Sequence, residues 1–563
     1  MRRRFGAHLA GLITFCLLAL LAVSAAFLET RSYDFGWHLK TGELILERFE
    51  VPRADEFSFT SSGVPWADHE WLFQVVAALL FGALGHSGLL VLKALCALGT
   101  GAAGVASMRR SGASASAALV VVSLALFGLR TRLAERPESA SLLLVAAMAM
   151  ILLDLSRGDG RPFGRLAAAG LLSVIWANTH ASALLGPVLA IALAAGAGLD
   201  AIRSLAREDR VAGLRGVRWC LVSAVVTAAG LPINPYGFDL LAVPLRIAGA
   251  LASANLTNPE WLPPSLSSAP LFFAVAAAMI PLALGRLLLR RAGTGRTAAL
   301  LAVTLILGLT SIRHVGLFFA LLPAMAAGVI GGRSGVAWPL TTGALAALGL
   351  SAAMLFRPPQ GFQIGVGLQD ERFPVAAARF LETRMSDARA YNDTAFGGYL
   401  IWQGWPERRV FLDGRNEVHA ALLRELSAAL DDGRQWSGLM DRHEVEAAVL
   451  SYRKERIAVR DAVTGLVSES TFAETHFPAN AWALVYWDDL AMVYVRREGR
   501  FASLADALEY RHIRPESAAL GDLPAPSAPA ADGVIADIRR KLGEDPDCPL
   551  ARRLATVYGS GPL

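Results

Sequence analysis

The chain opens with the apolar run Leu9–Leu28, LAGLITFCLLALLAVSAAFL, which leads into the polar stretch Arg31–Glu43, RSYDFGWHLKTGE. A run of about 20 mostly apolar residues is long enough to cross a bilayer as a helix. The basic residues Arg2, Arg3 and Arg4 precede it, and such residues favour the cytoplasmic side. The sequence therefore predicts a membrane span followed by an extracytoplasmic loop rich in ionisable groups. A cleaved signal peptide is the alternative for this run, and it leaves the loop on the same side.

The whole chain has the composition of a membrane protein. Of its 563 residues, 54% are hydrophobic, and the mean hydropathy is +0.44, which is too apolar for an ordinary soluble protein. The net charge of +5 comes from arginines in short loops, which excludes nucleic acid as a partner. The cysteines Cys16, Cys96, Cys220 and Cys548 lie far apart. Their spacing predicts neither a disulfide nor a cysteine-based zinc site.

Apolar runs and arginines together predict the topology. Eleven spans are expected, at 9–28, 87–107, 113–129, 139–155, 164–180, 182–200, 217–233, 269–287, 297–311, 314–331 and 336–355. Alternation from a cytoplasmic N-terminus puts inside the cell the arginine-rich stretches, namely Arg109 and Arg110, 156–163, 203–215, Arg286 to Arg296, and Arg333. The other side receives 29–86, 130–138, the corner at Asn178, 234–268, Arg313 and everything after 356. We expect a multi-pass protein of a bacterial plasma (inner) membrane, with a cytoplasmic N-terminus and an extracytoplasmic C-terminal domain.

Three regions are expected along the chain. Residues 1–355 are predicted to form a polytopic α-helical membrane domain with about 11 transmembrane helices and a large first outer loop, 29–86. Residues 356–521 are predicted to form an extracytoplasmic α/β domain, with a helix at 374–384 and strands near 387–391, 409–412, 446–450 and 482–496. Residues 522–563 hold a Pro/Ala/Ser-rich linker, Pro524 to Ala531, and one terminal amphipathic helix.

The first outer loop carries an ionisable cluster just after the membrane exit. Asp34, His38 and Lys40 lie within one or two helical turns of each other. A carboxylate there can act as a general base or bind a divalent metal. The alternative is that Trp37 and Tyr33 are interfacial anchors and that the charges are simply solvated.

A second cluster, Asp68-His69-Glu70, follows in the same loop and leads into the amphipathic segment 71–86. Three successive residues cannot share one helix face, so at most two of them line a site together. Helix capping by Asp68 and Glu70 is the alternative. Two such clusters in one loop indicate a shared pocket.

Further polar groups are predicted on the same side of the membrane. They are Arg130, Arg132 and Arg136 with Glu135, then Asn178 and His180, Asn234 and Tyr236, and Arg313 and His314. Outer arginines run against the positive-inside bias and indicate an anionic partner such as a lipid phosphate. For Arg313 the alternative is an ion pair with Glu135 or Glu260. Lys93, in the second predicted span, either reaches outward or pairs with a lipid phosphate.

Turns with polar residues are predicted both in the membrane domain and in the C-terminal domain. The proline-rich stretch Asn258–Pro264, which contains Glu260, predicts a rigid edge of the pocket. In the C-terminal domain, Tyr391–Trp402 and Phe411–Asn416 resemble strand-to-loop transitions, where ligands often bind. Ordinary turn chemistry of their glycines is the alternative.

The first outer loop also carries a family resemblance. Asp34 opening a large loop, the helix Trp37–Gly42, the turn at Pro52 and the stretch Asp68–Trp71 before the second span resemble the C-type superfamily of membrane glycosyltransferases. That superfamily includes protein mannosyltransferases, oligosaccharyltransferases and the aminoarabinose transferases of lipid A. Its members take a sugar from a polyprenyl-phosphate carrier and hold the catalytic acid in this loop. The resemblance covers residues 9–355.

The resemblance implies an inverting hexosyl or pentosyl transfer from a polyprenyl-phosphate-linked sugar to a lipid, glycan or protein. It implies that Asp34 is the base or the acid that orients the acceptor. It also implies that Glu70 or His69 helps to hold the acceptor or a metal, and that Arg313 neutralises the carrier phosphate. Many members carry adjacent acids in this loop, whereas Asp34 is followed by Phe35. No cofactor therefore follows from the resemblance, and a divalent metal stays open.

The candidate site falls into four groups by expected role. Asp34 and Glu70 are the catalytic candidates; His38, Asp68 and His69 would bind the acceptor or a metal; Arg313, His314, Arg130, Arg132 and Lys93 would bind the carrier phosphate; and Trp37, Lys40, Asn178, His180, Asn234 and Glu260 would line the pocket. Two alternatives remain. An envelope lipid or glycan transporter would carry ionisable residues near the bilayer centre, and a non-enzymatic scaffold for envelope assembly would not need the loop acids.

Overall fold

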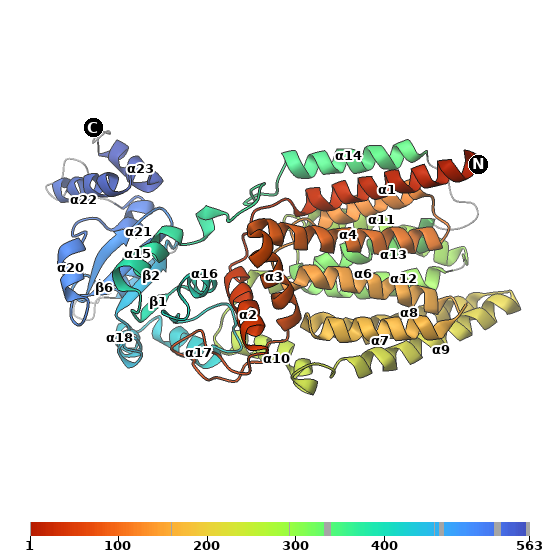
Figure 1. The fold of residues 1–563 in the computed structure, drawn as a ribbon, viewed down its shortest axis with the longest axis horizontal. Coiled ribbons are helices and arrows are strands. Elements are labelled where there is room, and N and C mark those ends of the chain that lie inside the picture. Colours follow the sequence, from red (N-terminus) through yellow and green to blue (C-terminus); the bar gives the residue numbers. More distant parts are fainter. Residues whose placement is uncertain are drawn as a thin grey trace.

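The computed structural model describes residues 2–158, 160–291, 293–330, 339–454, 456–460, 467–522 and 531–558. A helical bundle forms one end of the molecule and a smaller mixed domain forms the other, with α2 (Phe35–Arg48) and α3 (Trp71–Leu84) between them (Figure 1). Arg333 and the predicted linker, except Ala531, lie outside the described residues.

Each predicted span corresponds to a helix of the bundle. These helices are α1 (Arg2–Ala26), α4 (His86–Arg110), α5 (Ala115–Leu129), α6 (Pro137–Ser156), α7 (Pro162–Ala177), α8 (Leu185–Arg203), α9 (Arg207–Gly230), α11 (Pro270–Leu288), α12 (Thr294–Thr310), α13 (Val315–Ile330) and α14 (Leu340–Phe356). Among the described residues, seven helices are long and apolar enough to cross a membrane; they contain α1, α4, α6, α8, α9, α11 and α13. The other four are shorter apolar helices. The chain is a multi-pass membrane protein.

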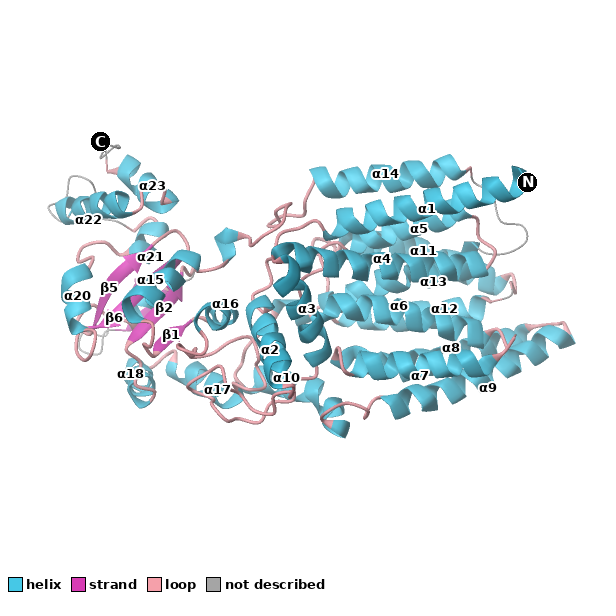
Figure 2. Cartoon of the chain, in the orientation of Figure 1, coloured by secondary structure: helices cyan, strands magenta, loops and turns pink. Residues whose placement is uncertain are grey.

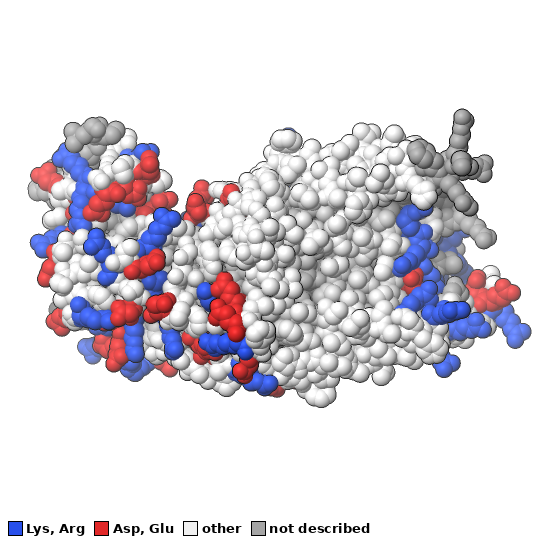
Figure 3. Space-filling view, viewed as in Figure 1, with Lys and Arg blue, Asp and Glu red and all other residues white. Residues whose placement is uncertain are grey.

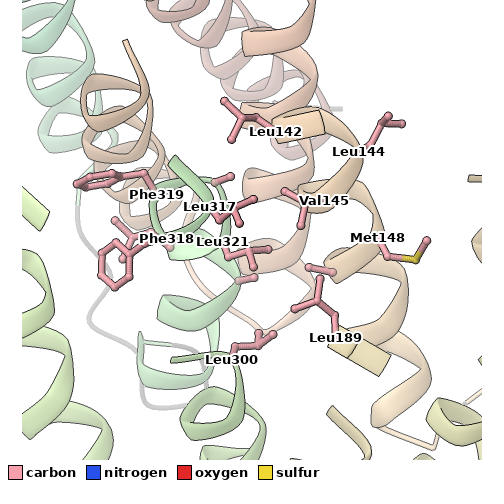
Figure 4. Packing of buried hydrophobic residues seen from close by; sticks show 14 of the residues in the cluster. Leu142, Leu144, Val145, Met148, Leu189, Leu300, Leu317, Phe318, Phe319 and Leu321 are labelled. Atoms are coloured by element: carbon pink, nitrogen blue, oxygen red, sulfur yellow. The ribbon is translucent and has the colours of Figure 1, made fainter. Parts of the chain in front are cut away.

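The core of the bundle runs along α6 and α13, the most enclosed of the long apolar helices. Val145 of α6 and Leu317 and Leu321 of α13 belong to one buried cluster (Figure 4). Peripheral helices instead expose large apolar side chains such as Leu171 and Val225. Lipid would cover these side chains, because contact between apolar surface and water is unfavourable.

Charged side chains occupy the two ends of the molecule and leave an uncharged band between them (Figure 3). At the end far from the C-terminal domain, the visible charges are mostly basic (Figure 3). Arg109 and Arg110 end α4, Arg203 ends α8 and Arg286 ends α11. The uncharged band is what a bilayer core requires.

The C-terminal domain is built on a four-stranded sheet (Figure 2). Its order is β1 (Ala390–Asn392), β2 (Ala447–Ser451), β6 (Ala491–Arg496) and β5 (Trp482–Trp487), with β1 and β2 parallel and the other neighbours antiparallel. β3 (Ile457–Arg460) and β4 (Val467–Ser470) form a separate antiparallel pair. The surrounding helices are α15 (Val375–Met385), α16 (Thr394–Gly404), α17 (Ala420–Ala429), α18 (Gly433–Arg442), α19 (Phe472–His476), α20 (Ala502–Leu508), α21 (Pro515–Ala519), α22 (Ala531–Glu544) and α23 (Pro549–Val557).

Three expectations for the C-terminal domain are wrong. The single strand expected at 482–496 is a hairpin of two antiparallel strands, β5 and β6. The predicted strand at 409–412 does not join the sheet; Val410 makes a single parallel bridge with Ser58 of the first outer loop. The expected single terminal helix is divided into α22 and α23, since prolines at 546 and 549 interrupt helical hydrogen bonding. Both helices pack into the same apolar cluster as Trp436.

Helix α2 contacts both α16 of the C-terminal domain and α3 through glycines. A Cβ on Gly36 of α2 would lie 2.1 Å from the carbonyl oxygen of Gly398 in α16, and a Cβ on Gly398 would lie 2.2 Å from that of Tyr33. A Cβ on Gly42 would lie 2.1 Å from the carbonyl oxygen of Gln74 in α3. Only residues without a side chain allow such close approach, so α2 is fixed between α16 and α3.

We expect Gly36→Ala to lower the unfolding temperature of the detergent-solubilised protein, measured by circular dichroism. The added methyl group collides with backbone, which cannot move aside as a side chain can, and overpacking of this kind costs about 1–3 kcal/mol. Gly82→Ala in α3 is the control, since nothing lies within 4 Å of its Cβ, and alanine there is neutral or gains up to about 1 kcal/mol. Equal unfolding temperatures for the two variants would contradict the crossing.

Candidate functional site

The two acid clusters of the first outer loop meet at the starts of α2 and α3. Asp34 and Glu70 occupy the N-cap positions of these helices, and in the described structure neither side chain forms a capping hydrogen bond. The capping interpretation is therefore wrong for Glu70. Nδ1 of His38, in the first turn of α2, lies 3.9 Å from Oε2 of Glu70, so the clusters form one site.

Asp34 connects the first outer loop with the loop between α5 and α6. Its Oδ2 lies 3.1 Å from Nη2 of Arg136, and its Oδ1 accepts a hydrogen bond of 3.4 Å from the indole of Trp37. A quarter of its side chain, 25%, stays exposed. The carboxylate is thus oriented by two donors while one side remains accessible.

Glu70 lies among three imidazoles. Nε2 of His69 is 3.5 Å and Nε2 of His180 is 3.9 Å from its Oε1, while His38 approaches the other oxygen. His180 follows the corner after α7, where the chain turns into the short helix η1 (Ala181–Leu184). The predicted corner at Asn178 therefore brings a histidine from another segment to the loop acids.

Burial and mutual charge set the protonation of this cluster. Burial alone would raise the pKa of Glu70, but the charge and hydrogen bond of His69 outweigh it and hold the pKa of Glu70 well below its usual range. Burial also disfavours a charged His69, yet Glu70 raises the pKa of His69 above its usual range. For His38 and His180 burial prevails and lowers each pKa to about 4. At neutral pH one carboxylate–imidazolium pair thus stands between two neutral imidazoles.

Asp68 differs from its neighbour Glu70 in charge state. Asp68 is 1% exposed, and its Oδ1 accepts a hydrogen bond of 2.8 Å from the amide of Gln74. Its Oδ2 is buried without a partner in the described ranges. Burial, reinforced by the charge of Glu70, raises the pKa of Asp68 to about 7. Two carboxyls with separated pKa values are the arrangement that divides acid from base roles.

Arginines line the bundle side of the site. Arg132 and Arg136 each reach Oε1 of Glu260 at 3.3 Å, and Arg132 also pairs with Glu138. Nε of Arg313 lies 4.0 Å from Oε2 of Glu138. All three guanidinium nitrogens of Arg132 contact Glu138 or Glu260, and those of Arg136 contact Ser32, Glu260 and Asp34. Arg313 is held more loosely, by the single contact of 4.0 Å with Glu138, and a guanidinium in that position can bind an anion.

Known proteins share the fold of this chain but not its sequence. No protein-family model matches the chain, and no curated protein matches its sequence. Solved structures do match. The archaeal oligosaccharyltransferase AglB from Archaeoglobus fulgidus, in complex with an inhibitory peptide and a dolichol-phosphate, superposes with a TM-score of 0.59 at 10% identity, covering 94% of this chain and 85% of that one. The chain therefore shares the fold of this membrane oligosaccharyltransferase.

Two other structures of the Archaeoglobus fulgidus enzyme show the same likeness. The apo form has a TM-score of 0.59 at 10% identity and covers 97% of this chain and 85% of that one. The form tethered to an acceptor peptide containing the NVT sequon has a TM-score of 0.55 at 10% identity, covering 82% and 74%. The likeness in fold therefore extends over both the bundle and the C-terminal domain of this chain.

Three residues that were expected to bind the carrier phosphate contact other side chains of this protein. Lys93 is 3% exposed, forms an ion pair with Glu135 and donates a hydrogen bond of 2.6 Å to the carbonyl of Leu28. It neither reaches outward nor stays free for a phosphate, because the buried pair already neutralises it. Arg130 lies over the Phe127 ring, 4.0 Å from its centroid. For Arg313, the carboxylate within ion-pair distance is Glu138 and not Glu135 or Glu260.

Several predicted pocket residues hold the backbone in place. Asn178 accepts a hydrogen bond from the Trp71 indole and donates to the carbonyl of Ile233. Asn234 donates to the carbonyls of Leu231 and Gly237. These contacts join the corner after α7 and the loop after α9 to the start of α3. Lys40 pairs with Glu43 at 2.7 Å on α2, and Nδ1 of His314 is a buried atom without a partner in the described chain.

A buried charged network beside the site was not predicted. Arg415 of the C-terminal domain pairs with Asp413 and, across the interface, with Asp55 of the first outer loop, and His419 also reaches Asp413. The sequence predicts the stretch with Asp413 and Arg415 as a ligand-binding strand-to-loop transition or, alternatively, as an ordinary turn, and not as a link to the first outer loop. Its partner Asp55 is too distant in the chain for any local pattern to reveal.

A divalent metal was left open by the sequence. In the parts of the chain that the structure describes, no three His, Cys, Asp or Glu side chains are arranged to hold a metal ion. Asp34 is instead paired with Arg136, and Glu70 with His69. Both acids are therefore already partnered by basic side chains.

Asp68→Asn should stabilise the protein more at high pH than at low pH. In the folded protein Asp68 keeps its proton until about pH 7, whereas its unperturbed pKa is 3.8. As pH rises through this interval, only the unfolded state gains from ionisation, so the stability of the wild type falls. Asparagine stays neutral, and the difference in unfolding temperature between variant and wild type should therefore grow from about pH 5 to about pH 8.

Asp547→Asn is the matched control for this measurement, because the Asp547 side chain is 88% exposed. It should leave the pH dependence of unfolding unchanged. A constant difference between Asp68→Asn and wild type across this range would mean that Asp68 is ionised in the folded protein.

Proposed function

We propose that this protein is a glycosyltransferase that moves a sugar from a polyprenyl-phosphate carrier to an acceptor on the extracytoplasmic face. The observation that carries the proposal is the meeting of Asp34 and Glu70 with the arginines Arg132, Arg136 and Arg313 at one end of a C-type fold. Neither acid is spent on helix capping in the described structure. Acids and arginines are the groups that a transfer from a phosphate needs.

The donor side of the site is the arginine group at the end of the bundle. A sugar carried on a lipid phosphate would lie with its chain in the membrane and its phosphate at the boundary, where Arg132 and Arg313 are found. Guanidinium groups bind phosphate oxygens with paired hydrogen bonds and stabilise the charge that develops as the phosphate leaves. The matched oligosaccharyltransferase was solved with a dolichol-phosphate, which supports a carrier of this chemical class.

The acceptor side is the group of acids. In the proposed step, an acceptor hydroxyl or amide gives its proton to Asp34 and attacks the anomeric carbon. The bond from that carbon to the phosphate oxygen breaks, and the phosphate leaves on its lipid with the electron pair. One displacement of this kind inverts the anomeric centre. Glu70, whose side chain is 13% exposed, would hold the acceptor by accepting a hydrogen bond from it.

The distribution of arginines supports the proposed orientation. The bundle end far from the C-terminal domain is mostly basic (Figure 3), and it includes Arg109, Arg110 and Arg203 at helix ends. Basic loops favour the cytoplasm. The site and the C-terminal domain would then face outward, where lipid-linked sugars are used after translocation.

Asp34→Asn and Glu70→Gln test the proposal in a deletion strain. Each variant keeps its shape and loses its negative charge, so envelope glycans that depend on the enzyme should fall about 100-fold or more, as general-base contributions are of that size. Mass spectrometry of envelope glycans and glycolipids measures the product, with membrane levels of each variant checked in parallel. Glu47→Gln, an exposed residue of α2, should restore the wild-type pattern.

The three function classes give different results in that strain. If both acid variants restored the envelope glycans fully, the transferase hypothesis would be rejected and the scaffold hypothesis would remain. If deletion caused a completed lipid-linked glycan to accumulate inside the cell without loss of any linkage, a transporter would replace the enzyme.

Arg313→Gln should weaken the use of the lipid carrier. A hydrogen bond to a charged group contributes about 1.5–3 kcal/mol, so the concentration of polyprenyl phosphate that half-inhibits transfer should rise about 10-fold or more. The comparison is with Arg246→Gln, which removes an exposed arginine from another outer segment and should change nothing. Equal inhibition of both variants would remove Arg313 from the donor site.

A further inference from the structure

The turn Asp413–Arg415 of the C-terminal domain is fully enclosed by charged partners. Arg415 is 2% exposed; its Nη2 lies 2.6 Å from Oδ2 of Asp413 and 2.6 Å from Oδ1 of Asp55. His419 Nε2 lies 3.1 Å from Oδ2 of Asp413 and Nδ1 of the same ring lies 3.0 Å from Oγ of Ser61. Two of these partners, Asp55 and Ser61, belong to the first outer loop. The turn is thus locked onto that loop.

The guanidinium of Arg415 also supports the aromatic side chains behind the acids. It lies 4.6 Å from the ring centroid of Trp66 and 6.0 Å from that of Trp37. The two indoles meet edge to face, with centroids 6.0 Å apart. Trp37 lies against His38, with the two rings tilted by 38°, and donates its indole hydrogen bond to Asp34. Trp66 lies two residues before Asp68, the start of the second acid cluster. Contacts therefore run from Arg415 to both acid clusters.

Gly414 touches the proposed base itself. A Cβ at this position would lie 2.3 Å from Oδ1 of Asp34 and 3.7 Å from the indole nitrogen of Trp37. The atom in the way is the end of a side chain, so a methyl group would displace the Asp34 carboxylate and leave the backbone and the Arg415 ion pairs in place. The turn backbone thus forms one wall against Asp34.

We propose that the turn Asp413–Arg415 is a positioning element of the transfer site: the Gly414 backbone sets where the Asp34 carboxylate lies, and Arg415 fixes Trp37 and Trp66 behind the two acid clusters. The C-terminal domain then contributes residues that position the side chains of the site. This inference rests on the proposed function, because positioning is defined by the reaction that Asp34 serves.

Gly414→Ala is the decisive variant. Transfer is assayed with membranes that contain the full-length protein, total lipid extract of the deletion strain as the donor source and its envelope fraction as the acceptor. The maximal rate should fall about 100-fold, since a displacement of about 1 Å at a reacting group costs that much. The donor concentration for half-maximal rate should stay unchanged, because the arginine side is untouched. Gly438→Ala is the control, with nothing within 4 Å of its Cβ in the same domain.

Arg415→Lys tests the second half of the inference. Lysine keeps the charge but cannot bridge two carboxylates in a plane while lying over Trp66, so the rate should fall although the domain stays docked. Docking is followed by the trypsin cleavage pattern of the connection after α14, and Arg442→Lys, which changes an exposed ion pair with Glu425, is the control. If Arg415→Lys releases the domain, Gly414→Ala alone decides the outcome.

The outcomes separate this inference from the function on which it rests. No product from wild-type membranes would reject the transferase. Product from wild type, none from Asp34→Asn, and wild-type rates from a docked Gly414→Ala would overturn the positioning role and leave the transferase intact. A loss of rate in Gly414→Ala with the unfolding temperature and trypsin pattern of wild type would establish it.

Discussion

The close crossing of α2 with α16 is the contact on which the rest of the site depends. At Gly36 and Gly398 two backbones touch where any side chain would hold them apart. Asp34 precedes α2 directly, so its distance from the C-terminal domain follows from this crossing. A wider separation would withdraw Asp34 from Gly414 and Trp37 from Arg415. Three glycines in two distant segments thus set the geometry of one carboxylate.

Charge pairs then select one docked arrangement from the many that apolar contact would allow. Arg415 pairs with Asp55 across the interface and with Asp413 in its own domain. Buried pairs of this kind add little net stability, because desolvation offsets most of the attraction, but a misdocked domain leaves each charge unpaired at a cost of several kcal/mol. In this chain the buried pairs therefore fix which surfaces meet, while apolar packing supplies the free energy of folding.

The sequence predicted what depends on local pattern and missed what depends on distant partners. Spans such as α4 and α6 were found because apolar length is a property of a single segment. Asp34 and Glu70 stood out because acids beside a membrane exit are uncommon. Lys93 was assigned to a phosphate because its true partner, Glu135, lies on another segment and cannot be recognised from the sequence around Lys93. The strand expected at 409–412 is likewise absent from the sheet, and Val410 bridges to the distant Ser58. Pairing across hundreds of residues leaves no period or spacing to detect.

The acids at the starts of α2 and α3 are placed for the site and not for the helices that they precede. Asp34 and Glu70 stand where a carboxylate would ordinarily cap a helix and add about 1 kcal/mol of stability, yet their side chains form no such bond within the described structure. Asp68 keeps a buried oxygen without a partner among the described residues. Buried polar groups are otherwise almost always bonded. Asp34 and Glu70 turn instead to the basic side chains Arg136 and His69. The chain therefore gives up capping stability to bring acids and bases together at one place, which is the arrangement that acid–base chemistry needs.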